Sequence, residues 1–136
     1  MGDYKTAMGM RILIADNHDL IRSAMSKLMC EAGWEVCGSV SDGKTAIEKA
    51  LELRPDLIIL DYRLDDRDGL SVGREIRALL PNVRMLLCTM FASRDLETEA
   101  KKSGFQGLAQ KSDGAALTGG RCSNPTRADH FSIQAT

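Results

Sequence analysis

The chain of 136 residues lacks any apolar run that approaches the roughly 18 residues of a membrane-spanning helix. Residues 1–9 also lack the apolar stretch of a signal peptide, so we expect them to form a flexible leader. The formal net charge of −1 shows no excess of one sign, which argues against broad electrostatic attraction to nucleic acid or to anionic lipid. A local charged patch is still open, but no membrane partner is expected.

The cysteines form no C-x-x-C pair, which disfavours a zinc or redox motif. They are Cys30, Cys37, Cys88 and Cys122. Cys88 lies inside an apolar run, where a thiol packs as a small hydrophobic group. A chain of this length also buries roughly two-thirds of its unfolded surface without needing a disulfide. We therefore interpret the cysteines as reduced thiols of a cytoplasmic protein.

Short aliphatic runs alternate with helical patterns along residues 10–111. Arg11–Ala15 is apolar at consecutive positions, which suits a strand buried on both faces of a parallel sheet. The later runs are Trp34–Val40, Asp56–Leu60, Val83–Cys88 and Phe105–Gln110. Single helices between consecutive strands require right-handed crossovers. The sequence thus predicts an α/β domain over residues 10–111, with a doubly wound, five-stranded parallel sheet.

Four helices are expected between these strands. The first ends at Gly33 in a left-handed conformation, and the second begins at Ser41 or Asp42 and stops before Pro55. The third spans about Gly69–Leu80, and the fourth spans about Ser93–Ser103 and is closed by Gly104. The inward-facing residues expected on the first two helices are Leu20, Ile21, Ala24, Met25, Leu28 and Met29, then Ala46, Ile47, Ala50, Leu51 and Leu53.

The last segment, residues 112–136, follows a different pattern. It holds glycines and a proline among small polar residues, with no helical stripe longer than Ala115–Leu117. We expect at most one helical turn there, followed by an irregular tail.

Polar residues of matching chemistry stand where four of the predicted strands end. Asp16 and Asn17 follow the first strand, Asp61 the third, Thr89 the fourth and Lys111 the fifth. Each alone has an ordinary explanation as a helix cap, a turn former or a surface charge. Since the carboxyl ends of parallel strands share one edge of a sheet, their convergence is hard to obtain by chance.

This set suits phosphoryl transfer to a carboxylate. A carboxylate nucleophile and a phosphoryl donor are both anionic, so a divalent cation has to screen them, and oxygen ligands favour Mg²⁺. Asp16 and Asp61 can supply carboxylate oxygens. Thr89 and Lys111 can donate to the charge that develops on the transferred group.

Four segments resemble the motifs of response-regulator receiver domains of two-component systems. They are RILIADNHDLIRSAMSKLM, DLIILDYRLDDRDGL, VRMLLCTMF and GFQGLAQKS. Their order and spacing are most similar to the receivers of helix-turn-helix (LuxR-type) transcriptional regulators. The resemblance implies a flavodoxin-like receiver fold and a phosphorylation-dependent signalling switch that is not classed as an enzyme.

The resemblance also implies a role for each residue of the set. Asp61 matches the phosphoacceptor, which takes its phosphoryl group from a histidine kinase. Asp16 matches an acidic ligand of Mg²⁺, Asn17 stands at the second metal-binding position, and the backbone carbonyl of Arg63 matches a third protein ligand. Two further matches are the switch hydroxyl, Thr89, and the phosphate-binding lysine, Lys111. We interpret His18 as a partly exposed residue that opens the first helix, not as a ligand or base.

Three positions depart from the family pattern. Asn17 replaces a second acid, so we expect weaker Mg²⁺ binding and slower phosphorylation. Asp65 replaces a proline, so we expect a less rigid loop after the acceptor. Leu108 replaces the aromatic residue that reports phosphorylation to the outer face. These departures favour, as the alternative, a pseudo-receiver that acts as a protein-interaction module without phosphorylation.

The segment after Lys111 is a further departure, because the family forms a fifth helix there. That helix often contributes to a homodimer surface, so a homodimer is an assembly the resemblance allows and the sequence leaves open. DNA binding is expected only through an effector domain, which this chain does not contain.

Overall fold

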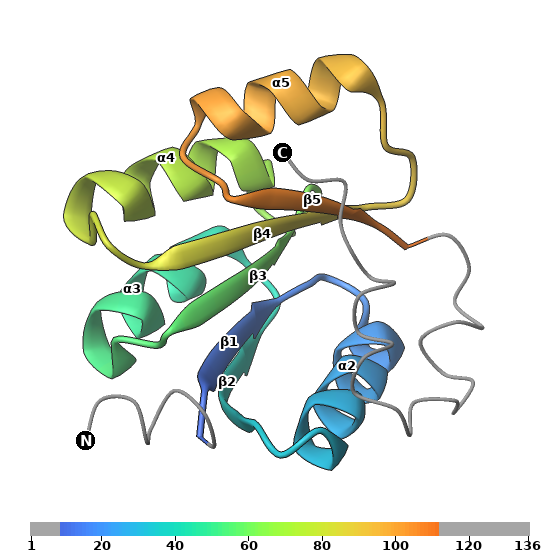
Figure 1. Ribbon diagram of the computed structural model, residues 1–136, viewed down its shortest axis with the longest axis vertical. Helices are drawn as coiled ribbons and strands as arrows, with labels where there is room; N and C mark the ends of the chain where they lie inside the picture. Colours follow the sequence, from blue (N-terminus) through green and yellow to red (C-terminus); the bar gives the residue numbers. More distant parts are fainter. Residues whose placement is uncertain (1–8, 112–136) are drawn as a thin grey trace.

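The computed structural model describes residues 9–111. They form a five-stranded sheet with helices on both faces (Figure 1). The strands are β1 (Arg11–Ala15), β2 (Glu35–Val40), β3 (Leu57–Asp61), β4 (Arg84–Thr89) and β5 (Gly107–Gln110). The helices are α2 (Asp19–Glu31), α3 (Gly43–Leu53), α4 (Gly69–Leu79) and α5 (Arg94–Lys102). The predicted α/β fold class is confirmed, while the leader and the tail lie outside the described residues.

The sheet is parallel throughout, in the order β2-β1-β3-β4-β5. The central strands β1 and β3 are aliphatic at consecutive positions because helices cover both of their faces. β2 lies on one side of β1, whereas β3, β4 and β5 follow on the other side, so the direction in which strands are added changes between β1 and β3. The carboxyl ends of these two strands therefore flank the crevice where doubly wound sheets place their sites.

The two faces of the sheet carry separate apolar cores. The larger core lies under α3, α4 and α5 and includes Leu13, Leu60 and Leu87. The smaller core lies under α2, where Met25 and Met29 pack against Ile14. Figure 1 shows this division, with α2 alone on its side of the described sheet. The cores hold β1 and β3 in place from both sides, which fixes the residues at their ends.

Several predicted boundaries are confirmed by the backbone. Gly33 and Gly104 adopt positive φ angles of 91° and 97° after α2 and α5, as expected of glycines that end helices. The side chain of Asp42 accepts a hydrogen bond from Thr45 N at 2.9 Å and caps α3.

Four strands, β2 to β5, begin later than predicted, and for β2 and β5 the expected first residues complete the preceding turns. Trp34 N donates to Met29 O at 3.0 Å, and Phe105 N donates to Ala100 O at 3.0 Å. These amides close helix ends and are not available to the sheet. The strand patterns of the sequence therefore began one residue too early at Trp34, Asp56 and Val83 and two residues too early at Phe105.

Two residues predicted to face inward are on the surface. The exposed fraction is 79% for Leu20, in the first turn of α2, and 40% for Leu51, near the end of α3. Leu20 lies in the first turn of α2 and Leu51 in the last turn of α3, at helix ends, where apolar spacing alone does not determine burial. The prediction was wrong for these two residues.

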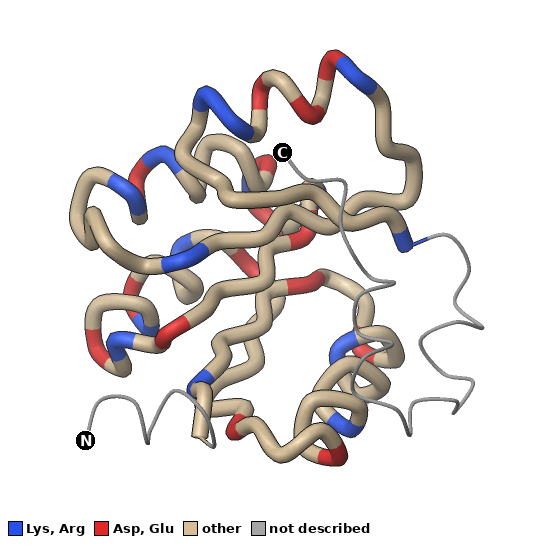
Figure 2. Tube along the Cα trace, in the orientation of Figure 1, with Lys and Arg blue, Asp and Glu red and all other residues tan. Residues whose placement is uncertain are grey.

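Charged residues of both signs are spread over the four helices (Figure 2). This agrees with the net charge of −1. Among the described residues, no helix combines the length and the apolar character needed to cross a membrane.

Candidate functional site

The carboxyl ends of β1, β3 and β5 bring two carboxylates and an ammonium group into direct contact. Lys111 Nζ lies 2.8 Å from Asp16 Oδ2 and 3.1 Å from Asp61 Oδ1. All three residues are buried, with exposed fractions of 0% for Asp16, 4% for Asp61 and 5% for Lys111. The structure therefore brings these three predicted site residues together, although Asp16 and Lys111 are 95 positions apart in the sequence.

Burial has the largest single effect on the pKa of Asp61 and on the pKa of Lys111. It raises the pKa of Asp61, and the nearby charge of Asp16 adds to this effect, while Lys111 opposes it. Burial also disfavours the ammonium form of Lys111, but the hydrogen bond to Asp16 and the charge of Asp61 outweigh it and raise the pKa of Lys111. The lysine therefore stays positively charged at neutral pH beside the Asp61 carboxylate, which burial makes more basic.

Two buried oxygen atoms at this site have no hydrogen-bond partner among the described residues. They are Asp61 Oδ2 and Asn17 Oδ1. A buried oxygen without a donor is costly in a folded protein, and such an atom commonly marks a missing ion or water. Asp16 and Asp61 each place a carboxylate oxygen within 4.8 Å of the other, and oxygen donors suit Mg²⁺. The residues present therefore fit the cation that the sequence predicts.

Thr89 ends β4 next to Lys111. Lys111 N donates to Thr89 O at 2.7 Å, and Thr89 Oγ1 accepts a hydrogen bond from Phe91 N at 3.3 Å. The Thr89 side chain is 6% exposed. The predicted switch hydroxyl thus sits at the same sheet edge as the ion-paired residues and is held by its own loop.

The loop that follows Asp61 is closed by backbone hydrogen bonds. Gly69 N donates to Tyr62 O at 2.7 Å, and Leu64 N donates to Arg67 O at 3.2 Å. A side chain at Gly69 would collide with the backbone carbonyl of Asp61, so glycine is required for α4 to begin here. Arg63, whose carbonyl is the predicted third metal ligand, lies inside this closed loop.

Asp66 ties this loop to the start of α3 and was missed by the sequence analysis. Its Oδ1 accepts from Gly43 N at 2.6 Å and its Oδ2 accepts from Lys44 N at 3.1 Å. Asp65 N also donates to Ser41 O at 3.3 Å. These contacts tie the loop to the start of α3, and the expectation that Asp65, in place of proline, leaves the loop less rigid stays a prediction. The contacts of Asp66 could not be read from the sequence, because they join it to the start of a helix 23 positions earlier.

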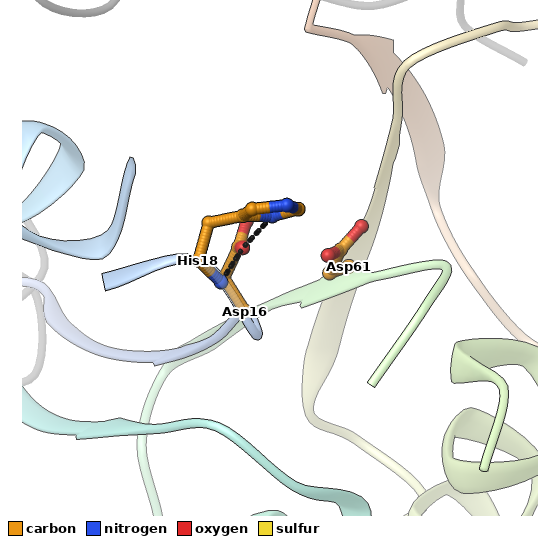
Figure 3. A group of neighbouring side chains, drawn as sticks. All are labelled: Asp16, His18 and Asp61. Carbon is orange, nitrogen blue, oxygen red and sulfur yellow. Dashed lines mark hydrogen bonds and ion pairs between the residues drawn. The ribbon is translucent and has the colours of Figure 1, made fainter. Parts of the chain in front are cut away.

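His18 occupies the N-cap position of α2, where the sequence analysis placed it. Its side chain is 57% exposed, and its Nδ1 lies 3.4 Å from Asp16 Oδ1. Figure 3 shows the imidazole lying over the Asp16 carboxylate, with Asp61 facing it across the site. The histidine is therefore next to the carboxylates that were predicted to bind metal.

Leu108, which replaces the family's aromatic reporter, is 2% exposed and lies in the larger core. The remaining part of the predicted output surface, beyond Lys111, lies outside the described residues.

Known proteins are similar to this chain in sequence and in fold. Residues 12–118 match the family model of the response regulator receiver domain. Over 104 residues the chain is 32% identical to the chemotaxis protein CheY of Thermotoga maritima, covering 76% of this chain and 87% of that protein. The chain belongs to the response regulator receiver domain family.

Two further similarities place the chain within that family. It is 33% identical over 110 residues to the response regulator protein VraR of Staphylococcus saprophyticus, which covers 80% of this chain and 53% of VraR. The chain therefore spans about half the length of that relative. A two-component response regulator of the LuxR family from Aurantimonas sp. SI85-9A1 superimposes with a TM-score of 0.73 at 26% identity, covering 80% of this chain and 85% of that chain. The predicted likeness to LuxR-type receivers is confirmed.

Proposed function

We propose that this domain is a phosphorylation-dependent switch that accepts a phosphoryl group on Asp61. The observation that carries the proposal is the unpartnered Asp61 Oδ2 atom, buried beside a lysine that holds the other oxygen. A carboxylate fixed at one oxygen and free at the other is placed to act as a nucleophile. Family membership supports the same reaction.

In the proposed reaction, Asp61 Oδ2 forms a bond to the phosphorus of a phosphohistidine in a histidine kinase. The bond between phosphorus and the imidazole nitrogen breaks, and its electron pair leaves with the nitrogen. Bound Mg²⁺ would supply positive charge that screens the two anionic reactants. Asp16, the Asn17 amide oxygen, Asp61 and the backbone carbonyl of Arg63 are the residues proposed to hold the cation.

Lys111 and Thr89 are proposed to bind the transferred group. The Lys111 ammonium can turn from Asp61 Oδ1 to a phosphoryl oxygen while it keeps its 2.8 Å contact with Asp16. The Thr89 hydroxyl can donate to a second oxygen, and its backbone link to Lys111 would carry that movement into β5. This would stabilise the charge that develops in the transition state.

The downstream role follows from the relatives by analogy only. VraR is a response regulator about twice the length matched here. We infer that this receiver controls transcription through a separate or additional effector domain, in the cytoplasm, and that DNA binding does not reside in residues 10–111. A homodimer is the assembly proposed for the phosphorylated state.

The proposal is tested by incubating the native protein with Mg²⁺ and acetyl phosphate and measuring the intact mass. A gain of one phosphoryl group is expected in the wild type and in Asp65→Asn, since Asp65 is exposed and its side chain has no partner among the described residues. No gain is expected in Asp61→Asn. An equal gain in Asp61→Asn would contradict the assignment of the acceptor.

The same experiment separates the switch from a pseudo-receiver. Asn17 in place of an acid is the observation that favours the pseudo-receiver, because it removes one negative charge from the cation site. If the wild type gains no phosphoryl group at saturating Mg²⁺ but Asn17→Asp does, the natural domain works without phosphorylation.

A further inference from the structure

Three potential ligand atoms converge at the acidic end of the sheet. One atom each from Asp16, His18 and Asp61 lie within 4.8 Å of one another, and Figure 3 shows the imidazole and the two carboxylates around a common space. Two of these residues were assigned above to Mg²⁺. The histidine adds a nitrogen donor to a site otherwise made of oxygen atoms.

A second observation points to a ligand in this space. Asp61 is 4% exposed, and its Oδ2 atom has no hydrogen-bond partner among residues 9–111. The Asn17 Oδ1 atom is buried and unpartnered in the same way. Two buried oxygens that lack donors require a cation or water to satisfy them. The cluster therefore has buried oxygen atoms that a bound ion or water would satisfy.

The backbone around His18 is fixed while its ring is free to adjust. His18 N donates to Asp16 Oδ1 at 2.8 Å, which holds the main chain against the carboxylate. The ring is 57% exposed, and Asp16 is the only residue in the described part of the chain with which it is paired. A small rotation can therefore bring an imidazole nitrogen to a cation held by Asp16 and Asp61, without moving α2.

We propose that His18 is a ligand in this site and makes it bind a borderline transition-metal dication, of the Ni²⁺ or Zn²⁺ class, more tightly than Mg²⁺. The inference rests on the cation site of the proposed function but does not require that Asp61 be phosphorylated. It concerns which ion the site binds, and therefore which ion is present when a phosphodonor reaches Asp61.

Two features of the chain act together toward this selectivity. Asn17 leaves one negative charge fewer, which weakens binding of the hard Mg²⁺ ion most, because that ion depends on anionic oxygen ligands. Imidazole nitrogen suits Ni²⁺ and Zn²⁺, which also bind a given nitrogen and oxygen site more tightly than lighter dications do. Asn17 therefore lowers the affinity for Mg²⁺, and His18 raises the affinity for Ni²⁺ and Zn²⁺.

The test is isothermal titration calorimetry of the full chain with NiCl₂ and, separately, with MgCl₂. His18→Gln is expected to weaken Ni²⁺ binding on the order of tenfold to a hundredfold, the range that loss of even an outer partner produces. The same variant should change Mg²⁺ affinity by less than about twofold, since Mg²⁺ takes oxygen ligands. His130→Gln, which removes the other histidine of the chain, is the matched control and should leave both affinities unchanged.

A spectroscopic readout locates the ion independently of affinity. Proton NMR of the two histidine rings, assigned by their absence in the two variants, should show that substoichiometric Ni²⁺ broadens the His18 signals and spares those of His130. In Asn17→Asp, the ratio of Ni²⁺ to Mg²⁺ affinity should fall, because the added charge favours Mg²⁺.

The outcomes separate this inference from the proposed function. Unchanged Ni²⁺ affinity in His18→Gln, or an equal loss in His130→Gln, would overturn the histidine ligand while leaving phosphorylation of Asp61 intact. Saturable Ni²⁺ binding that depends on His18, combined with no phosphoryl gain in Mg²⁺, would support the ligand and contradict the switch.

Discussion

The hydrogen bonds of Asp66 make the loop after Asp61 a direct target for mutation. Asp66→Ala removes a carboxylate that accepts from Gly43 N at 2.6 Å and from Lys44 N at 3.1 Å. Asp42 already satisfies Thr45 N, so Asp66 completes the capping of the first three amides of α3. Without Asp66, two amides at the start of the helix lose their protein partner, and the loop loses its attachment to α3.

The expected loss follows from the usual cost of removing a helix cap. That cost is about 1 kcal/mol and reaches about 2 kcal/mol. Since Asp66 makes two such bonds but is exposed to solvent, we expect the free energy of unfolding to fall by about 1–2 kcal/mol. In a domain of this size, that corresponds to a decrease in the unfolding temperature of roughly 4–10 °C.

The assay is urea unfolding followed by circular dichroism at pH 7, with Asp65→Ala as the control. Asp65 lies next to Asp66 and is exposed, but its side chain has no partner in the described part of the chain, so its variant should match the wild type. The reasoning would be refuted if Asp66→Ala were as stable as the wild type. It would also be refuted if Asp65→Ala lost as much stability as Asp66→Ala, which would indicate a general charge effect.

The pH dependence gives a further check on the same bonds. Burial raises the pKa of Asp66, but the amides of Gly43 and Lys44 outweigh it, and the pKa is lowered. A carboxyl with a lowered pKa stabilises the fold above its unfolded pKa of about 4 and loses this effect as the pH falls through its folded pKa. The difference between wild type and Asp66→Ala should therefore be constant from pH 7 to about pH 4.5 and shrink below about pH 4.

Three other substitutions have defined outcomes. Lys111→Met leaves the carboxylates of Asp16 and Asp61 buried without their cation, so urea unfolding should show a loss of about 3 kcal/mol, partly restored by MgCl₂. Asp61→Asn should raise stability at pH 7 without divalent cations, because burial raises the pKa of this carboxyl. The stabilising effect of a group with a raised pKa is complete below its unfolded pKa and is lost as the pH rises through its folded pKa, so the gain in Asp61→Asn should disappear as the pH is lowered from 7 toward about 4, and a pH-independent gain would contradict this cause. Gly73→Ala would place a methyl group against the Phe105 ring and should cost about 1–3 kcal/mol in thermal unfolding.

The part of the site that lies at strand ends could be predicted from the sequence. Runs of consecutive aliphatic residues identify buried parallel strands, and the topology of such a sheet brings their carboxyl ends to one edge. Asp16, Asp61 and Lys111 could therefore be grouped before any contact was known, and the ion pairs show that they meet.

The interactions that the sequence did not reveal depend on tertiary placement. Asp66 is one of several acids in a polar loop, and nothing local shows that it reaches the first turn of a helix 23 residues earlier. Leu20 fits the apolar stripe of its helix by spacing alone, yet in the first turn of α2 it is 79% exposed. The position of the His18 ring over Asp16 likewise depends on a side-chain torsion, which spacing does not encode.

The contact between Lys111 and Asp16 can form only after the residues of β5 have been synthesised. The lysine reaches from β5, at one edge of the sheet, to the end of β1, which lies on the other side of β3 and β4. During synthesis Lys111 is the last of Asp16, Asp61 and Lys111 to be added to the chain. If the first four strands fold before it emerges, the two acids are buried together without their counterion, and under the proposed function the nucleophile would then be in place before the group that binds the transferred phosphoryl.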